Sequence, residues 1–261
     1  MGFLDGKKAL VTGLASERSI AYGVAEAMRS QGAELVLTYQ GDKLKDRVEK
    51  MGEQLGATAV LPLDVAEDEQ IDALFESLGK HWSELDILVH AIGFAPRDAL
   101  SGGYLDSLSR DGARISHDIS AYSFAALAKA ARPMLSDSAA LLTLSYLGAV
   151  RAIPSYNIMG PAKASLESSM RFMAADLGHQ GIRVNAISAG PIKTLAAAGI
   201  RDFRSMLGFA REGSALKRNV TPAEVGNVAA FLCSDLASAV TGDVVYVDAG
   251  YHIMGMVVAG E

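Results

Sequence analysis

The sequence predicts an α/β fold, a doubly wound sheet of seven parallel strands with helices on both faces. Seven short apolar runs recur along the chain and are almost continuously hydrophobic. Continuous rather than alternating hydrophobicity is typical of strands that are buried on both faces. Amphipathic segments separate these runs, and this alternation of strand and helix predicts right-handed crossovers within one sheet.

The apolar runs are expected to form the strands in chain order. They are 8–13 (KALVTG), 33–39 (AELVLTY), 58–64 (TAVLPLD), 86–92 (DILVHAI), 140–146 (ALLTLSY), 182–188 (IRVNAIS) and 243–249 (DVVYVDA). Helical patterns between them include 20–32 (IAYGVAEAMRSQG) and 68–82 (DEQIDALFESLGKHW). Because no linker, low-complexity tract or tandem repeat interrupts this order, residues 1–261 are expected to form one domain.

Composition narrows the class of protein. The net charge is −6 and no basic run occurs, which argues against a nucleic-acid-binding protein. No apolar segment approaches the roughly 20 residues of a membrane span, and the N-terminus lacks the pattern of a signal peptide, so a cytoplasmic protein is expected. The single cysteine, Cys233, excludes an internal disulfide and is expected to be a buried apolar residue. The five histidines lack metal-ligand spacing, so no metal site is predicted.

The stretch 189–220 is too long for a simple loop and contains helical pieces. It follows the sixth predicted strand, and ligands of open α/β sheets bind at the carboxyl edge of the strands. A lid over the substrate, at about 192–218, is therefore the favoured interpretation, and a purely structural excursion is the alternative.

The first strand leads into a turn, 12–23 (TGLASERSIAYG), that resembles a dinucleotide-binding turn. Backbone N–H groups in such a turn hold a pyrophosphate at the start of a helix. The G-x-G-x-x-G pattern is absent, although Gly13, Ser19 and Gly23 are present. A strand-to-helix turn can also require glycine for geometry alone, so this turn by itself is a weak signal.

Three further strand ends strengthen the prediction of a dinucleotide cofactor. Gln40 follows the second strand, where a group facing the adenosine ribose belongs, and its neutral side chain favours NADH over NADPH, whose 2′-phosphate needs a cation. Asp64 and Val65 follow the third strand and suit the edge and face of an adenine. Gly93 follows the fourth strand and permits close approach of the backbone.

The chain resembles the short-chain dehydrogenase/reductase superfamily, and within it the bacterial NADH-dependent enoyl-acyl-carrier-protein reductases. The stretches that carry the resemblance are SIAYG, LTYQGDKLK, LDVAED, HAIGFAP, HDISAYSF, LLTLSYLGA, SYNIMGPAKAS, RVNAISAGPIKTLAA and TGDVVYVDAG. They span essentially the whole chain. The resemblance implies a Rossmann-like fold, and reduction of the carbon–carbon double bond of a trans-2-enoyl thioester with NADH in fatty-acid elongation.

One motif departs from the wider superfamily, most of whose members carry Tyr-x-x-x-Lys. Met159 stands four residues before Lys163, and the nearest preceding tyrosine is Tyr156. On a helix, seven residues span within ~20° of two full turns, so Tyr156 and Lys163 would share a face with the hydroxyl moved one turn outward. Such a donor suits an enoyl reductase, in which charge develops on the more distant thioester oxygen. Pro161, between them, predicts a bend or a helix whose regular bonding starts late.

The resemblance also implies roles for individual residues. Tyr156 would stabilise the enolate oxygen, Lys163 would anchor the nicotinamide ribose, and Tyr146 would be the second active-site tyrosine; simple packing is the alternative for the tyrosines. The cofactor-binding residues would be Gly13, Ser19, Ile20, Gln40, Asp64, Val65, Ile92, Gly93, Lys163, Ile192, Lys193, Thr194, Leu195 and Ala196. Those lining the acyl slot would be Phe94, Ala95, Leu100, Met159, Ile200 and Phe203, for which ordinary core packing is the alternative.

Two other functions compete with enoyl reduction. A carbonyl reductase of the same fold, such as a ketoacyl reductase, is disfavoured by the missing Tyr-x-x-x-Lys motif. A non-catalytic dinucleotide sensor would leave both tyrosines and Lys163 without a purpose.

The resemblance further implies a homotetramer and an acidic acyl-carrier protein as the partner that carries the substrate. The basic residues Arg201, Arg204, Arg211, Lys217 and Arg218, against Asp202 and Glu212, predict a docking site for it. An ordinary solvated helix face is the alternative.

Overall fold

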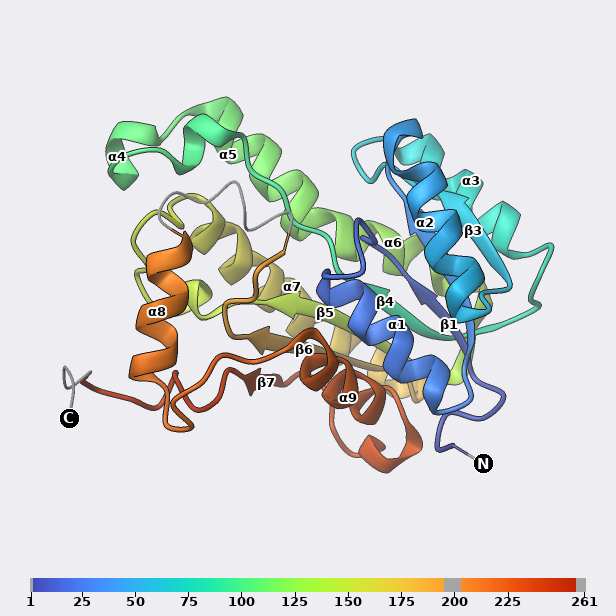
Figure 1. The fold of residues 1–261 in the computed structure, drawn as a ribbon. Coiled ribbons are helices and arrows are strands. Elements are labelled where there is room, and N and C mark those ends of the chain that lie inside the picture. Colours follow the sequence, from blue (N-terminus) through green and yellow to red (C-terminus); the bar gives the residue numbers. More distant parts are fainter. Residues whose placement is uncertain (1, 195–202, 257–261) are drawn as a thin grey trace.

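The fold is built on one twisted parallel sheet, as the sequence predicts (Figure 1). The computed structural model describes residues 2–194 and 203–256, and the side chains of 203 and 204 are not described. Within these residues the sheet has seven strands in the order β3-β2-β1-β4-β5-β6-β7, each parallel to its neighbours. The strands are β1 (Lys8–Val11), β2 (Glu34–Tyr39), β3 (Ala59–Pro62), β4 (Leu85–His90), β5 (Leu135–Ser145), β6 (Arg183–Ala189) and β7 (Val244–Val247). The strand order reverses beside β1, where ligands of doubly wound folds bind.

Helices cover both faces of the sheet. They are α1 (Ile20–Ser30), α2 (Asp42–Leu55), α3 (Asp68–Leu78), α4 (Tyr104–Ser107), α5 (Arg110–His117), α6 (Ser123–Ala131), α7 (Met159–Leu177), α8 (Phe203–Gly213) and α9 (Pro222–Leu232). A π-helical turn, η2 (Asp118–Tyr122), joins α5 to α6. No helix among the described residues is long and apolar enough to cross a bilayer.

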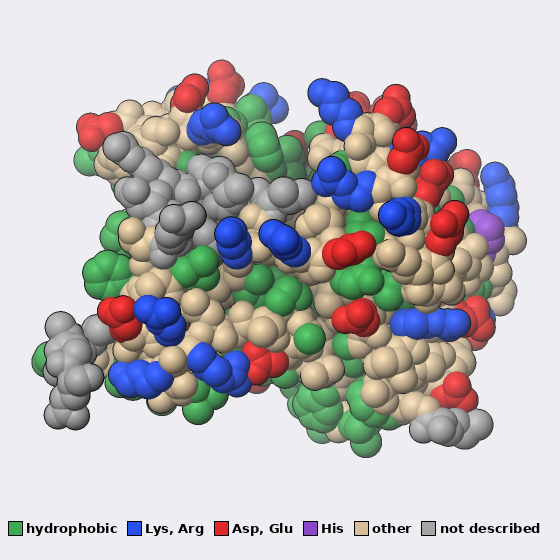
Figure 2. All heavy atoms as spheres, viewed as in Figure 1, with side chains coloured by type: hydrophobic (Ala, Val, Ile, Leu, Met, Phe, Trp, Pro, Cys, Tyr) green, Lys and Arg blue, Asp and Glu red, His purple; other side chains and the backbone are tan. Residues whose placement is uncertain are grey.

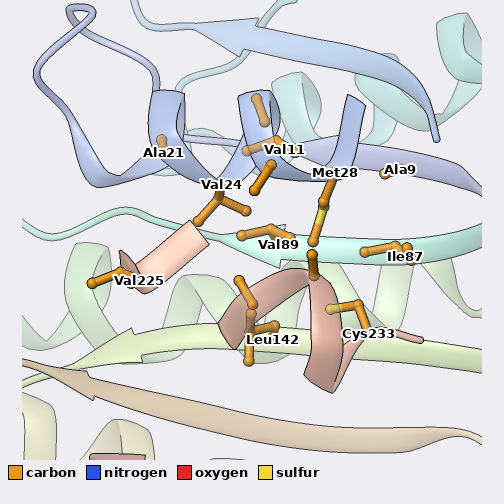
Figure 3. Close-up of a cluster of buried hydrophobic side chains, with 14 of the residues drawn as sticks. Ala9, Val11, Ala21, Val24, Met28, Ile87, Val89, Leu142, Val225 and Cys233 are labelled. Carbon is orange, nitrogen blue, oxygen red and sulfur yellow. The ribbon is translucent and has the colours of Figure 1, made fainter. Parts of the chain in front are cut away.

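On one face of the sheet, α1, α2 and α9 bury an aliphatic core. Val24 and Met28 of α1 point toward α9 and the sheet, and they belong to the same buried cluster as Val225 of α9 and Leu142 of β5 (Figure 3). Cys233 belongs to this core, as predicted, and its burial raises the pKa of the thiol to about 12. Helices α1 and α9 cross closely because each has a glycine at the crossing point, Gly23 and Gly226. A Cβ at Gly226 would lie 2.1 Å from the carbonyl oxygen of Gly23.

On the other face, α3, α6 and α7 bury a second core of similar size. It includes Phe75, Phe124, Leu166 and Met170. The predicted strands all exist, although β5 starts at Leu135, five residues before the predicted run. A register irregularity where β5 pairs with β4 accompanies this extension. The Rossmann-like fold of seven parallel strands is therefore confirmed.

Candidate active site

A cavity of about 650 Å³ opens at the carboxyl edge of the sheet. Its walls come from the ends of β1, β4, β5 and β6, from the starts of α1 and α7, and from α8. The lining residues are Gly13, Ala15, Ser19, Ile20, Ala21, Ala91, Ile92, Gly93, Phe94, Ala95, Arg97, Leu100, Leu144, Ser145, Tyr146, Tyr156, Met159, Lys163, Ala189, Gly190, Pro191, Ile192, Thr194 and Met206. Parallel strands bring their carboxyl ends to one edge, which is why residues far apart in sequence meet here.

The turn between β1 and α1 depends on a glycine and on a serine cap. Gly13 has a φ of +83°, and a Cβ there would lie 2.2 Å from the carbonyl oxygen of Ala91. Only glycine fits this combination of backbone angle and close approach. Ser19 caps α1 by accepting a hydrogen bond from the N–H of Tyr22, and its own hydroxyl donates to the Ser16 carbonyl at 2.7 Å. The Ser16 hydroxyl oxygen is buried without a hydrogen-bond partner.

The ends of β2 and β3 meet beside this turn, outside the cavity lining. The Gln40 amide donates to the Asp64 carboxylate at 3.0 Å, so the two predicted residues lie together. Val65, next to them, is buried. Arg47 of α2 donates to the Ala15 carbonyl at 3.2 Å. Arg47 is not among the residues that the sequence predicted for this corner.

The loop after β4 forms the floor of the cavity. A Cβ at Gly93 would lie 3.6 Å from the Lys163 Nζ and 3.7 Å from the Met159 Cε, so this glycine leaves room above the lysine. The next residue is held by the π-helical turn. The Ser120 hydroxyl accepts from the N–H of Phe94 and donates to its carbonyl, both at 2.9 Å. Such turns interrupt α-helices frequently at functional sites.

The two tyrosines pack against each other in the wall of the cavity. The ring centroids of Tyr146 and Tyr156 are 4.8 Å apart in an edge-to-face arrangement. Burial raises the pKa of Tyr156 well above its ordinary value, and the neighbouring Tyr146 and Glu167 raise it further. Burial is also the main cause of the raised pKa of Tyr146. Both hydroxyls therefore stay protonated at neutral pH and act as hydrogen-bond donors.

The predicted helical placement of Tyr156 is wrong. Helix α7 begins at Met159, and Tyr156 lies in the turn before it, flanked by Ser155 and Asn157 with φ angles of 61° and 42°. Pro161 therefore occupies the first turn of α7, where its missing N–H has no intrahelical partner to lose. The expectation of a late-starting helix is confirmed. Because Tyr156 lies before this helix, the seven-residue spacing no longer places Tyr156 and Lys163 on one helical face. The irregular turn nevertheless brings both side chains into the same cavity.

Lys163 is held at the base of the cavity. Its ammonium group donates to the Leu144 carbonyl at 2.7 Å, and the side chain is almost fully buried. Burial lowers the pKa of Lys163 to about 8, whereas the nearby Glu167 carboxylate acts in the opposite direction. The ammonium group of Lys163 thus has one fixed carbonyl acceptor, and its other N–H groups can donate hydrogen bonds to a ligand.

The structure brings most of the predicted site residues together. The predicted residues that line the cavity are Gly13, Ser19, Ile20, Ile92, Gly93, Phe94, Ala95, Leu100, Tyr146, Tyr156, Met159, Lys163, Ile192 and Thr194. Lys193 is exposed and does not line it. Leu195, Ala196 and Ile200 lie outside the described residues, as does the side chain of Phe203, and the predicted lid falls partly on this segment.

Several lining residues were not predicted. Leu144 and Ser145 directly precede Tyr146 at the end of β5, so the strand-end rule that found Gly93 could have found them. Met206 of α8 carries no such signal, yet its sulfur lies 3.6 Å from the Tyr146 hydroxyl oxygen. It reaches the site only through tertiary packing.

Most of the described basic side chains near α8 have acidic or carbonyl partners. Arg218 pairs with Glu224 at 2.6 Å, Arg211 lies 3.5 Å from Glu212, and Lys217 donates to the Glu212 carbonyl. Figure 2 shows Lys and Arg side chains interspersed with Asp and Glu on this side of the molecule. Glu224 is a third carboxylate in this region, in addition to the Asp202 and Glu212 that the sequence set against the five basic residues. Arg201 and the side chain of Arg204 lie outside the described residues.

Comparisons with known proteins agree on one family. The family model described as enoyl-(acyl carrier protein) reductase matches residues 13–252. The chain is 61% identical over 261 residues to the NADH-dependent enoyl-acyl-carrier-protein reductase FabI of Haemophilus influenzae, with 100% of both chains covered. It is 59% identical over 256 residues to the same enzyme of Escherichia coli, with 98% of each covered.

Solved structures give the same result. A crystal structure of the NADH-dependent enoyl-acyl-carrier-protein reductase of Aquifex aeolicus matches with a TM-score of 0.95 and 46% identity, covering 98% of this chain and 100% of that one. A structure of the Anaplasma phagocytophilum enzyme, described as a complex with NAD, matches with a TM-score of 0.93 and 42% identity, covering 99% and 96%.

Proposed function

Because the chain belongs to the enoyl-acyl-carrier-protein reductase family of short-chain dehydrogenases/reductases, we propose that the cavity at the carboxyl edge of its sheet is the active site. The protein is an NADH-dependent oxidoreductase of fatty-acid biosynthesis, and it reduces the carbon–carbon double bond of an enoyl-acyl-carrier protein. One observation carries the assignment of the site. Tyr146, Tyr156 and Lys163 line the same cavity as the glycine-bearing strand ends Gly13 and Gly93.

The residues present fit NADH. The turn after β1 offers a helix N-terminus and the unpartnered Ser16 hydroxyl, which suit a pyrophosphate. The free space above Gly93 lies next to the Lys163 ammonium, which would hold a ribose hydroxyl. The Gln40 amide is bonded to the Asp64 carboxylate, and this carboxylate disfavours the 2′-phosphate of NADPH at the same corner. Ile92, Ile192 and Thr194 complete the cofactor side.

The chemistry follows from the positions of the hydroxyl groups. Bound NADH supplies the hydride, which goes to C3 of the enoyl thioester. Negative charge then develops on the thioester oxygen, and the Tyr156 hydroxyl is the donor that stabilises it as an enolate. Because burial keeps this hydroxyl protonated, it can donate throughout the working pH range. Tyr146 packs edge-on against the Tyr156 ring and restricts its orientation.

The acyl chain has an apolar wall beside these tyrosines. Leu100, Met159 and Tyr156 form one buried cluster, and Ala95 packs against it. Phe94, half exposed at the mouth, extends this surface toward solvent. A hydrophobic slot of this kind binds an alkyl chain by burying its surface. The predicted lid at about 192–218 is proposed as the cover of this slot.

The experiment is to follow NADH oxidation with crotonyl and acetoacetyl thioesters side by side. An enoyl reductase consumes NADH with the first and not with the second, whereas a ketoacyl reductase does the reverse and a sensor consumes it with neither. Tyr156→Phe should lower kcat about 100-fold or more while NADH affinity stays near the wild-type value, since only a transition-state donor is removed. An unchanged kcat for crotonyl thioester would contradict the donor role.

We infer that the acyl-carrier protein docks beside α8, because Met206 of this helix lines the cavity that would take the acyl chain. Reversal of Arg201 and Arg204 to Glu should slow reduction of the carrier-bound substrate, and high salt should shrink this loss. Activity on the coenzyme A thioester, which needs the slot alone, serves as the control. Equal loss on both substrates would mean that these arginines support the slot rather than docking.

A homotetramer is the expected assembly. Phe172 on α7 is 77% exposed and is therefore available for contact with a second copy of the chain. Closed symmetric assembly would cover such surfaces. Sedimentation of the full-length protein measures this directly, and a monomer at micromolar concentration would contradict it.

A further inference from the structure

Two buried side chains of α7, one helical turn apart, bind consecutive residues at the end of β5. Lys163 donates to the Leu144 carbonyl at 2.7 Å, and Glu167 accepts from the Ser145 hydroxyl at 2.5 Å. Ser145 is the residue directly before Tyr146. The last two residues of the strand are therefore clamped to α7 immediately before the chain delivers the tyrosine to the cavity.

Glu167 is a carboxylate in an unusual place. It is 6% exposed, as is Lys163, and Ser145 is 5% exposed. Burial of a carboxylate without a compensating charge is costly, and one neutral hydroxyl supplies only part of that compensation. At a separation of four residues on a helix, the Cβ atoms of Lys163 and Glu167 are roughly 5–6 Å apart. Lys163 is thus a cation close enough to compensate part of the charge of this carboxylate.

We propose that Glu167 is a positioning residue for the reaction, which keeps Lys163 in its charged form and, through Ser145, fixes the end of β5 that leads into Tyr146. This inference rests on the proposed role of Lys163 as the anchor of the cofactor ribose. Glu167 itself touches neither the cofactor nor the substrate, since it is absent from the cavity lining.

The surrounding groups act in the same direction. Glu167 opposes the effect of burial on the pKa of Lys163, and it raises the pKa of Tyr156, so one carboxylate favours both a charged amine and a protonated phenol. His90 of β4 faces the lysine, and burial lowers its pKa to about 3, so it adds no competing cation. On the β7 side, burial raises the pKa of Tyr246. Glu167 and Asp248 raise it further, and Arg151 lowers it.

Two variants separate charge from structure. Glu167→Gln keeps the length of the side chain and an oxygen that accepts from Ser145, but removes the charge. Ser145→Ala keeps the charge and removes the hydrogen bond. If Glu167 only tied α7 to β5, the second variant would be the more damaging one, and neither would change how Lys163 titrates.

The experiment measures the NADH dissociation constant of the full-length enzyme from pH 6 to 10, by fluorescence, for wild type, Glu167→Gln, Ser145→Ala and Lys163→Met. In the wild type, affinity should fall as Lys163 loses its proton, and Lys163→Met should abolish this dependence. Glu167→Gln should move the midpoint down by about one pH unit, the lower end of the effect of a nearby opposite charge. Ser145→Ala should leave the midpoint in place and lower kcat.

The outcomes distinguish the two levels of the proposal. If the wild type shows no alkaline loss that Lys163→Met removes, the anchor role of the lysine fails, and the role of Glu167 falls with it. If that loss is present but Glu167→Gln does not move it, the inference about Glu167 alone is overturned. Should Glu167→Gln fail to fold, the double variant Ser145→Ala with Glu167→Met removes both polar partners together and leaves neither unpaired. The same downward shift is expected of it, and an unmoved midpoint would again overturn the inference.

Discussion

The two helical layers of this protein use the same sheet in different ways. Between α1 and α9 the interface is aliphatic at its centre (Figure 3). It closes to backbone contact at Gly23 and Gly226. On the opposite face, α7 carries a buried lysine and a buried glutamate near the cavity, beside the buried His90 of β4. Packing dominates the first layer, whereas the second accepts buried polar groups where chemistry is needed. Changes in the first layer should therefore alter stability, and changes near the cavity should alter turnover.

The largest expected effect is on the packing layer. In Gly226→Ala, the added methyl group would lie 2.1 Å from the carbonyl oxygen of Gly23, and backbone cannot move aside as a side chain can. We expect a loss of about 2 to 3 kcal/mol in the free energy of unfolding, measured with denaturant, because overpacking forces the helices apart. The control is Gly178→Ala, where nothing lies within 4 Å of the new methyl group. Equal stability of the two variants would contradict the close-packing account.

The next effect concerns how the stability of the polar layer, which contains His90, changes at low pH. Both ring nitrogens of His90 are bonded, to the hydroxyls of Thr143 at 2.8 Å and Ser123 at 2.9 Å, and burial lowers its pKa from 6.5 to about 3. A group whose folded pKa is depressed contributes stability above its unfolded pKa, and this stability is lost as pH falls from 6.5 toward 3.

Compared with His90→Gln, the wild type should therefore lose roughly 2 to 3 kcal/mol more between pH 7 and 4.5, since each pH unit is worth ~1.4 kcal/mol per proton. Denaturant unfolding of both proteins at each pH measures the difference. Parallel pH profiles would show that His90 does not titrate on unfolding in this range.

The smallest expected effect is on turnover at the cavity, and it is to be compared with the stability effect of Gly226→Ala. A Cβ at Gly148 would lie 2.4 Å from the Cδ1 of Tyr156, so Gly148→Ala must turn the ring of Tyr156. We expect kcat for a short enoyl thioester to fall about tenfold, equivalent to ~1.4 kcal/mol of transition-state stabilisation. The unfolding free energy should change less than in Gly226→Ala, because a ring at the cavity wall can move where backbone cannot. A stable variant with unchanged kcat would mean that the orientation of Tyr156 is not critical.

The sequence predicted the parts of the site that follow from strand ends. Gly13 and Gly93 lie where a buried apolar run stops, and parallel strands bring such ends together. Ile92 and Tyr146 lie at the same strand ends, but their roles were implied by the family resemblance. Gln40 and Asp64 were also found in this way, as neighbours at the ends of β2 and β3. These positions depend on local pattern and on one general rule of topology, which is why they could be predicted.

Other features could not be read from local pattern. The helical count placed Tyr156 on α7, but the positive φ angles of Ser155 and Asn157 put it in the preceding turn. Met206 approaches Tyr146 from a helix sixty residues away. Glu167 carries no local signal of burial in the sequence, yet the structure buries it against Ser145.

By itself, then, the sequence determined the seven-stranded fold, the edge of the sheet that carries the site, and the resemblance from which the enoyl reductase function was predicted. The hydrophobic runs and the residues that end them are local properties, and local properties can be recognised in the sequence alone. Only the tertiary structure decided which polar side chains lose their water, which hydroxyl points into the cavity and which carboxylate lies beneath the lysine. Burial and electrostatic coupling depend on distances between segments remote in the chain, and those distances exist only once the sheet and both helical layers have assembled.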